Sequence, residues 1–134
     1  MAFFNHTIKT GSKTEMVDIT HKIRESVSRS GIREGICIVF IPHTTAAVTI
    51  NEAADPSVQR DIIMEINKIV PRDDGYHHME GNSAAHIKSS IFGASSHIPV
   101  KDGDLSLGTW QGIFFCEFDG PRNRHYVVHI IGEK

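Results

Sequence analysis

Two segments in the first half of the chain have the spacing of amphipathic helices. In residues 18–31 an apolar residue recurs every fourth position, either Asp18 or Thr20 can cap the start, and Gly31 is suited to the end. Residues 55–71 carry the strongest helix pattern, with Asp55 as the N-cap and Pro56 in the first turn. Its apolar stripe consists of Val58, Ile62, Ile66 and Ile69.

A third, shorter helix is predicted for residues 83–92, with Asn82 as its N-cap and Gly93 at its end. The remaining apolar segments have strand patterns. Residues 3–10 alternate, whereas residues 35–42 are almost continuously apolar and β-branched, which is typical of a central strand buried on both faces. Further strands are predicted at residues 46–51, 95–100, 107–119 and 124–132.

The last two of these strands are separated by a Gly-Pro turn, which predicts a hairpin. The pattern as a whole predicts one α+β domain over residues 1–134. Its antiparallel sheets would form a sandwich of seven to nine strands with two or three helices.

Composition narrows the functional classes. A net charge of -2 and a pI near 6.5 argue against a protein that coats nucleic acid. No apolar run approaches the roughly 18–20 residues that span a membrane, and the first residues lack a signal-peptide pattern. We therefore expect a cytoplasmic protein without nucleic-acid or membrane partners. Cys37 and Cys116 lie in apolar runs and are interpreted as buried structural thiols.

Histidines supply the first candidate chemistry. His78 and His86 are close in the stretch "YHHMEGNSAAHIK", and His43 follows a proline at the end of a predicted strand. Three imidazoles could hold a catalytic zinc with one open coordination position. The spacing matches no established zinc motif, so each histidine could equally be a surface or hydrogen-bonded residue. His77 is the alternative to His78.

Basic residues supply a candidate anion site. Arg122 and Arg124 lie in the predicted Gly-Pro turn and could grip a phosphate, or they could simply be solvated at the tip of a hairpin. The N-terminus of the helix after Asn82 is also suited to an anion, and Lys88 could add a charge.

Two further places could contribute to a site. Glu52, which follows Asn51, could act as a general acid or base or could orient a histidine. Trp110 could stack on a planar ligand or fill the core, and the apolar positions that follow it favour the core.

Three long segments together resemble one family. The words "HTTAAVTINEAADPSVQRD", "YHHMEGNSAAHIKSSIFG" and "IPVKDGDLSLGTWQGIFFCEFDGPRNR" are similar to the YjbQ-like proteins, also called secondary thiamine-phosphate synthases. The resemblance covers nearly the whole chain. It implies a compact α+β protein that forms homotrimers and holds a divalent metal, most often zinc, by histidines.

The resemblance also implies roles for particular residues. The metal ligands would be His43, His78 and His86, and the family's Asn-Glu pair falls on Asn51 and Glu52. Together with Lys88, which is proposed from its charge, these two are the predicted catalytic residues. The substrate-binding residues would be Arg122, Arg124, Trp110 and Gln111.

The implied activity is a transfer reaction on a phosphorylated small molecule, which joins a pyrimidine pyrophosphate to a thiazole phosphate. The alternatives are a trimer that binds a metal or metabolite without turnover, as a sensor would, and a mainly structural oligomer.

Overall fold

The computed structural model of the protein describes all 134 residues and contains three helices and eight strands. The helices are α1 (Thr20–Ser30), α2 (Pro56–Ile69) and α3 (Ser83–Phe92). The strands are β1 (Ala2–Lys9), β2 (Glu15–Asp18), β3 (Glu34–Phe40), β4 (Ala46–Glu52), β5 (Ser95–Lys101), β6 (Asp104–Leu105), β7 (Gln111–Glu117) and β8 (Asn123–Glu133).

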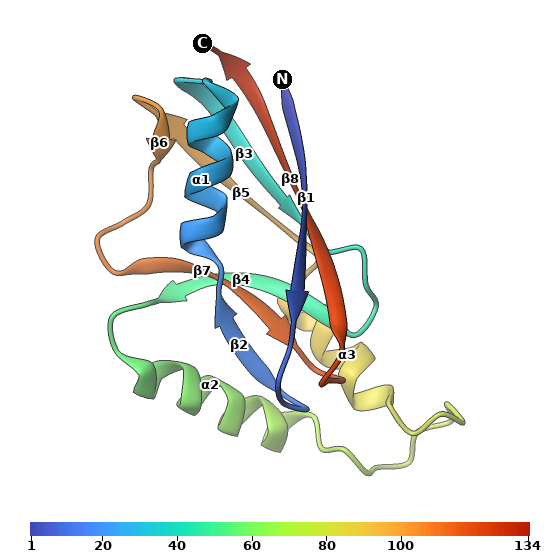
Figure 1. Ribbon diagram of the computed structural model, residues 1–134. Coiled ribbons are helices and arrows are strands. Elements are labelled where there is room, and N and C mark those ends of the chain that lie inside the picture. Colours follow the sequence, from blue (N-terminus) through green and yellow to red (C-terminus); the bar gives the residue numbers. More distant parts are fainter.

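The strands form two antiparallel sheets. Sheet A has the order β1-β8-β3-β5-β6, and sheet B has the order β2-β7-β4. Sheet B crosses sheet A at a steep angle, α1 lies beside sheet A, and α2 runs below sheet B (Figure 1). The predicted α+β class with antiparallel sheets is confirmed. No helix is both long enough and apolar enough to cross a membrane.

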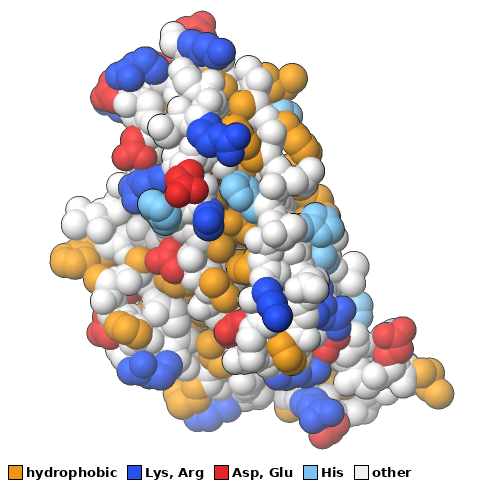
Figure 2. Space-filling view, in the orientation of Figure 1, with side chains coloured by type: hydrophobic (Ala, Val, Ile, Leu, Met, Phe, Trp, Pro, Cys, Tyr) orange, Lys and Arg blue, Asp and Glu red, His pale blue; other side chains and the backbone are white.

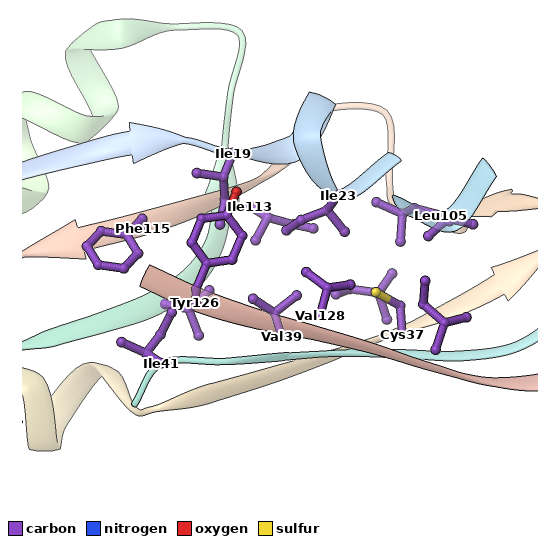
Figure 3. Close-up of a cluster of buried hydrophobic side chains, with 14 of the residues drawn as sticks. Ile19, Ile23, Cys37, Val39, Ile41, Leu105, Ile113, Phe115, Tyr126 and Val128 are labelled. Carbon is purple, nitrogen blue, oxygen red and sulfur yellow. The ribbon is translucent and has the colours of Figure 1, made fainter. Parts of the chain in front are cut away.

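The main core fills the space between the two sheets and α1. Seventeen buried residues form it, among them Ile23 of α1, Val39 of β3, Phe115 of β7 and Tyr126 of β8 (Figure 3). Because each element contributes one apolar face, the burial of these side chains fixes the angle between the sheets. Both cysteine thiols are free and buried, as predicted, and burial raises the pKa of each to about 12.

The helix boundaries follow from local signals. Asp55 accepts a hydrogen bond from the backbone N–H of Ser57 at 2.9 Å, and Gly31 ends α1 with a left-handed φ of 70°. Asn82 occupies the N-cap position of α3, but its side chain makes no capping bond. Its amide instead donates to Asp119 at 3.0 Å. The first residues of α3 are therefore left without a side-chain cap.

Three features of the strands differ from the predictions. The last two strands do not form a hairpin, because β7 pairs with β2 and β4 whereas β8 pairs with β1 and β3. The turn between them carries the chain from sheet B to sheet A. Strand β2 was not predicted, because residues 15–17 were assigned to no element and Asp18 was assigned to the following helix.

The predicted apolar stripe of α2 is buried only in part. Ile66 is 7% exposed, but Ile69 is 63% exposed. Ile66 packs with Val70 and Ala84 in a small cluster that joins the C-terminal end of α2 to the start of α3.

Strand β3 is buried on one face only, which corrects the expectation for residues 35–42. Cys37 and Val39 face the core, whereas Ile36 and Ile38 are half-buried and Phe40 is exposed. The strand register places these three on the same side as apolar residues of β1 and β8. We call this side the outer face, and its apolar residues are Phe3, Ile36, Ile38, Phe40, Val127 and Ile131.

A buried ion pair ties the two sheets together. Arg124 of β8 donates from Nε and Nη2 to the carboxylate of Glu117 in β7, at 2.9 and 2.5 Å. Both side chains are almost fully buried. Glu117 also accepts from the Thr10 hydroxyl, and Arg124 also donates to the Thr45 hydroxyl. The network therefore joins four separate segments at one point.

We expect Glu117→Gln to reduce the free energy of unfolding by about 3–5 kcal/mol, because it leaves the Arg124 charge buried without a counter-ion. Urea unfolding would measure this, with Glu65→Gln on the exposed side of α2 as the control. A loss no larger than that of the control would contradict a stabilising role for the pair.

The same pair predicts a loss of stability in acid. Burial alone would raise the pKa of Glu117, but the bonds from Arg124, Asp119 and Thr10 outweigh it and bring the pKa below its ordinary value of 4.5. A lowered carboxyl pKa gives stability that is fully present above the ordinary pKa and lost as the pH falls through the folded value. At pH values below about 4.5 the melting temperature of the wild type should therefore decrease, and that of Glu117→Gln should decrease less.

Candidate functional site

Two histidines meet beside the N-terminal end of α3. The rings of His78 and His86 have centroids 5.4 Å apart and are nearly perpendicular. They line a hollow of about 380 Å³, which we call the histidine hollow. Its lining residues are Gly75, Tyr76, His77, His78, Ser83, His86 and Ile87. Two of the three predicted metal ligands thus lie together.

The loop that carries His78 is fixed to the end of α2. The Tyr76 hydroxyl donates to the carbonyl of Pro71 at 2.6 Å, and the Tyr76 N–H donates to the carbonyl of Asp74. His86 lies in the second turn of α3 and is therefore held by the helix. His77 also lines the hollow, but the ring that faces His86 belongs to His78.

His43 lies elsewhere, at the connection between β3 and β4. Its Nε2 atom is 3.0 Å from the carbonyl oxygen and 3.2 Å from the amide nitrogen of His125, and the two rings have centroids 4.9 Å apart. Burial and the nearby charge of Arg124 lower the pKa of His43, which keeps the imidazole neutral at neutral pH. Neutral imidazole is the form that binds metal.

A second hollow, of about 520 Å³, surrounds His43. Its lining residues are Phe40, Ile41, Pro42, His43, Thr44, Thr45, Ala94, Arg122 and Arg124. It shares no residue with the histidine hollow. Within one chain, no group of three or more His, Cys, Asp or Glu side chains is placed to hold a metal ion. A catalytic zinc normally takes three protein ligands, so one chain supplies an incomplete set.

The two arginines of the turn do not form the predicted phosphate grip. The Nε and Nη2 atoms of Arg124 are occupied by Glu117 and Thr45, and the side chain is 3% exposed. Arg122 donates to both the backbone and the carboxylate of Asp119. The reason is physical, because a buried carboxylate at position 117 requires a buried cation, which the sequence pattern did not reveal.

Lys88 is the buried cation that the structure leaves without an acidic partner. The residue is 6% exposed, and its Nζ donates to the Asn67 side-chain oxygen at 2.5 Å. Burial and the charge of Lys13 lower its pKa. Lys88 lines a third hollow, of about 320 Å³, which we call the Lys88 hollow. Lys13, Asn67 and Arg72 also line it. No sequence motif marks these three residues, because only the packing of distant segments brings them to α3.

Four other predicted site residues lie at the opposite end of sheet B. Asn51 and Glu52 end β4, whereas His43 precedes its start, and seven strand residues span about 20 Å. The Glu52 carboxylate accepts from the backbone of Ala54 at 2.9 Å, and the Asn51 oxygen accepts from that of Glu52. Both side chains therefore shape the turn into α2.

Gln111 and Trp110 lie beside them, because Gln111 pairs with Glu52 in the sheet. The Gln111 side-chain oxygen accepts from the backbone of Gly108 at 2.8 Å. Trp110 is 65% exposed, so the expectation that it fills the core is wrong. In one chain these four residues are remote from all three predicted metal ligands.

Comparison with known proteins connects this arrangement to one family. Residues 4–133 match the family described as UPF0047 protein YjbQ-like. The UPF0047 protein MJ1081 of Methanocaldococcus jannaschii is 53% identical over 131 residues, which cover 98% of this chain and 95% of that protein. The UPF0047 protein YugU of Bacillus subtilis is 48% identical and covers 93% of this chain and 96% of its own.

Solved structures point to the same family. A protein of the YjbQ/UPF0047 family from Clostridium acetobutylicum superposes with a TM-score of 0.94 at 49% identity, covering 96% of this chain and 99% of its own. A YbjQ-like protein from Sulfolobus solfataricus superposes with a TM-score of 0.95 at 38% identity, covering 98% of this chain and 97% of its own. The chain therefore belongs to the YjbQ-like UPF0047 family.

Proposed function

We propose that the protein is an oligomeric, metal-binding enzyme that acts on a phosphorylated small molecule. The observation that carries this proposal is the pair of facing imidazoles, His78 and His86, at the wall of an open hollow. Two histidines held by a helix and a fixed loop are a preorganised half of a metal site. The coupling of a pyrimidine pyrophosphate to a thiazole phosphate is proposed as a secondary activity.

The third ligand would come from another copy of the chain. His43 supplies a second half-site, because its Nε2 contacts the backbone of His125 while its other ring nitrogen makes no hydrogen bond within the chain. Zinc suits such an all-imidazole set better than magnesium does. When bound, the metal would supply positive charge to a phosphate group of the substrate.

The outer face of sheet A supports assembly of the chain into a homotrimer. Phe3, Phe40 and Ile131 are 59%, 45% and 43% exposed, and the register joins them into one apolar surface. Figure 2 shows hydrophobic and histidine side chains side by side along the edge over β1 and β8. Apolar strands that one chain leaves uncovered are typical of subunit contacts.

The same assembly would bring distant residues into one site. Phe40 of the outer face also lines the hollow around His43, so a neighbouring copy on that face would approach His43 directly. Asn51, Glu52, Trp110 and Gln111 would join the histidines only across such a contact. In that position Glu52 would act as acid or base, and the exposed ring of Trp110 would stack on a planar substrate.

Metal content tests the foundation of the proposal. We expect the purified wild type to hold zinc at a fixed stoichiometry, and His86→Ala to lose it, because the helix-held ligand is removed. Elemental analysis by mass spectrometry measures this, with His21→Ala as the matched control, since the His21 side chain is 84% exposed on α1. A wild type without metal, or a His86→Ala protein with full metal content, would refute the metal site.

A single-turnover assay then separates an enzyme from a sensor. We expect the metal-loaded protein to join the pyrimidine pyrophosphate to the thiazole phosphate, which forms thiamine phosphate and releases pyrophosphate. His86→Ala should lose at least tenfold in rate, since even loss of a residue that orients a metal ligand costs about this much. Saturable binding of both compounds without product would instead favour the sensor.

Assembly is tested on the outer face. We expect Ile131→Asp to shift the protein from trimer to monomer, because a buried charge would oppose the contact. Analytical ultracentrifugation reports the mass, with Met64→Asp as the control, since Met64 is 49% exposed on α2 and is not part of the outer face. A monomeric wild type, or an unchanged mass for Ile131→Asp, would contradict the proposed contact.

A further inference from the structure

The Lys88 hollow is lined by positive charge and by no carboxylate. Its charged lining residues are Lys13, Arg72 and Lys88. Lys13 already pairs with Asp119 at 2.5 Å, whereas neither Arg72 nor Lys88 lies in an ion pair. The hollow therefore holds two cations whose charge the protein itself does not balance.

The position of Lys88 makes this imbalance costly for the free protein. An ammonium group has three donors, and Lys88 uses one of them on a neutral amide oxygen. Burial of a charge without a counter-ion is unfavourable, and Lys13, which lines the same hollow, carries a charge of the same sign. A bound anion would remove both penalties.

The start of α3 adds further hydrogen-bonding groups to the same hollow. Gly81, Asn82, Ala84 and Ala85 line it. The backbone N–H group of Ala84 has no acceptor in the protein, and the helix dipole places partial positive charge there. The buried Oδ1 atom of Asn82 also lacks a partner, although its amide nitrogen is held by Asp119.

These groups define the chemistry of the missing ligand. The ammonium and the helix amides require an oxygen anion, and the unpaired acceptor of Asn82 requires a donor on the same ligand. A phosphate that carries one proton, or a phosphate whose parent molecule carries an amino or hydroxyl group, provides both. A volume of about 320 Å³ admits a pyrophosphate or a small phosphate ester.

We propose that the Lys88 hollow binds the phosphate or pyrophosphate group of the substrate, with Lys88 as its buried cation and the N-terminus of α3 as its amide cradle. This inference rests on the proposed function for its substrate class. It transfers the phosphate-binding role from Arg122 and Arg124 to Lys88 and the start of α3.

Calorimetric titration of the purified protein tests the site. The probes are inorganic phosphate, inorganic pyrophosphate and a thiazole phosphate ester, which distinguish a free anion from an ester. We expect at least one probe to bind with a 1:1 stoichiometry per chain. Lys88→Met should weaken that binding roughly 10- to 100-fold, as expected for loss of one charged hydrogen bond in a buried site.

Matched variants separate this effect from a general loss of charge. Lys101→Met removes an exposed lysine of β5 and should leave affinity unchanged, and Lys88→Arg should retain part of it. If Lys88→Met does not fold, as judged by circular dichroism, Arg72→Gln decides, with a loss of a few-fold expected because Arg72 is exposed.

The site is refuted when Lys88→Met binds the probes with the affinity of the wild type. Where Arg72→Gln is the deciding variant, wild-type affinity in that variant refutes it. Absence of binding by all three probes overturns it as well. The same titrations on His86→Ala separate this inference from the metal site. Binding that survives His86→Ala but not Lys88→Met supports the hollow even where the metal proposal fails, and binding lost only in His86→Ala assigns the anion to the metal instead.

Discussion

The buried ion pair between Glu117 and Arg124 is the constraint on which the arrangement of the two sheets depends. β7 belongs to sheet B and β8 to sheet A, so the turn between them must cross from one sheet to the other. The pair closes across this turn with two charged hydrogen bonds, and Thr10 and Thr45 satisfy further donors and acceptors. A charge pair in the interior is tolerated only when its remaining hydrogen bonds are satisfied in this way.

The same network positions half of the candidate site. Arg124 holds the Thr45 backbone and hydroxyl, and the residue after Arg124 holds the ring of His43. The charge of Arg124 also favours the neutral form of His43. An arginine that would otherwise be available for a phosphate is therefore used to set the place and protonation of an imidazole, and the proposed phosphate site relies on other cations.

Local signals in the sequence were sufficient for the helices and for most strands. The bounds of α3 and the ends of α1 and α2 follow from caps, prolines and glycines, which act within a few residues. The separation of β7 from β8 could not be predicted in this way, because strand pairing depends on contacts between distant segments. For the same reason the apolar run of β3 was assigned two buried faces, although one chain covers only one of them.

The sequence identified candidate residues of the site but not how they are arranged in space. "YHHMEGNSAAHIK" placed His78 and His86 near each other because a helix turn and its preceding loop are local. It could not place His43, whose partners come from β8, nor show that Arg124 is neutralised by Glu117. Lys88 was identified as a cation, but its lack of a counter-ion depends on α2 and on the loop with Lys13, which are far away in sequence.

Helix α3 links the two chemistries that the sequence stretch contains. His86 and Lys88 are two positions apart, and residues at that spacing point to different sides of a helix. The Lys88 hollow and the histidine hollow accordingly both lie against α3 but have no lining residue in common. A helix is about 10 Å wide, so a metal at His86 and an anion at Lys88 would be separated by roughly that distance. A single phosphate cannot contact both, whereas a substrate with a phosphate at one end and its reacting group at the other can extend around the N-terminus of α3.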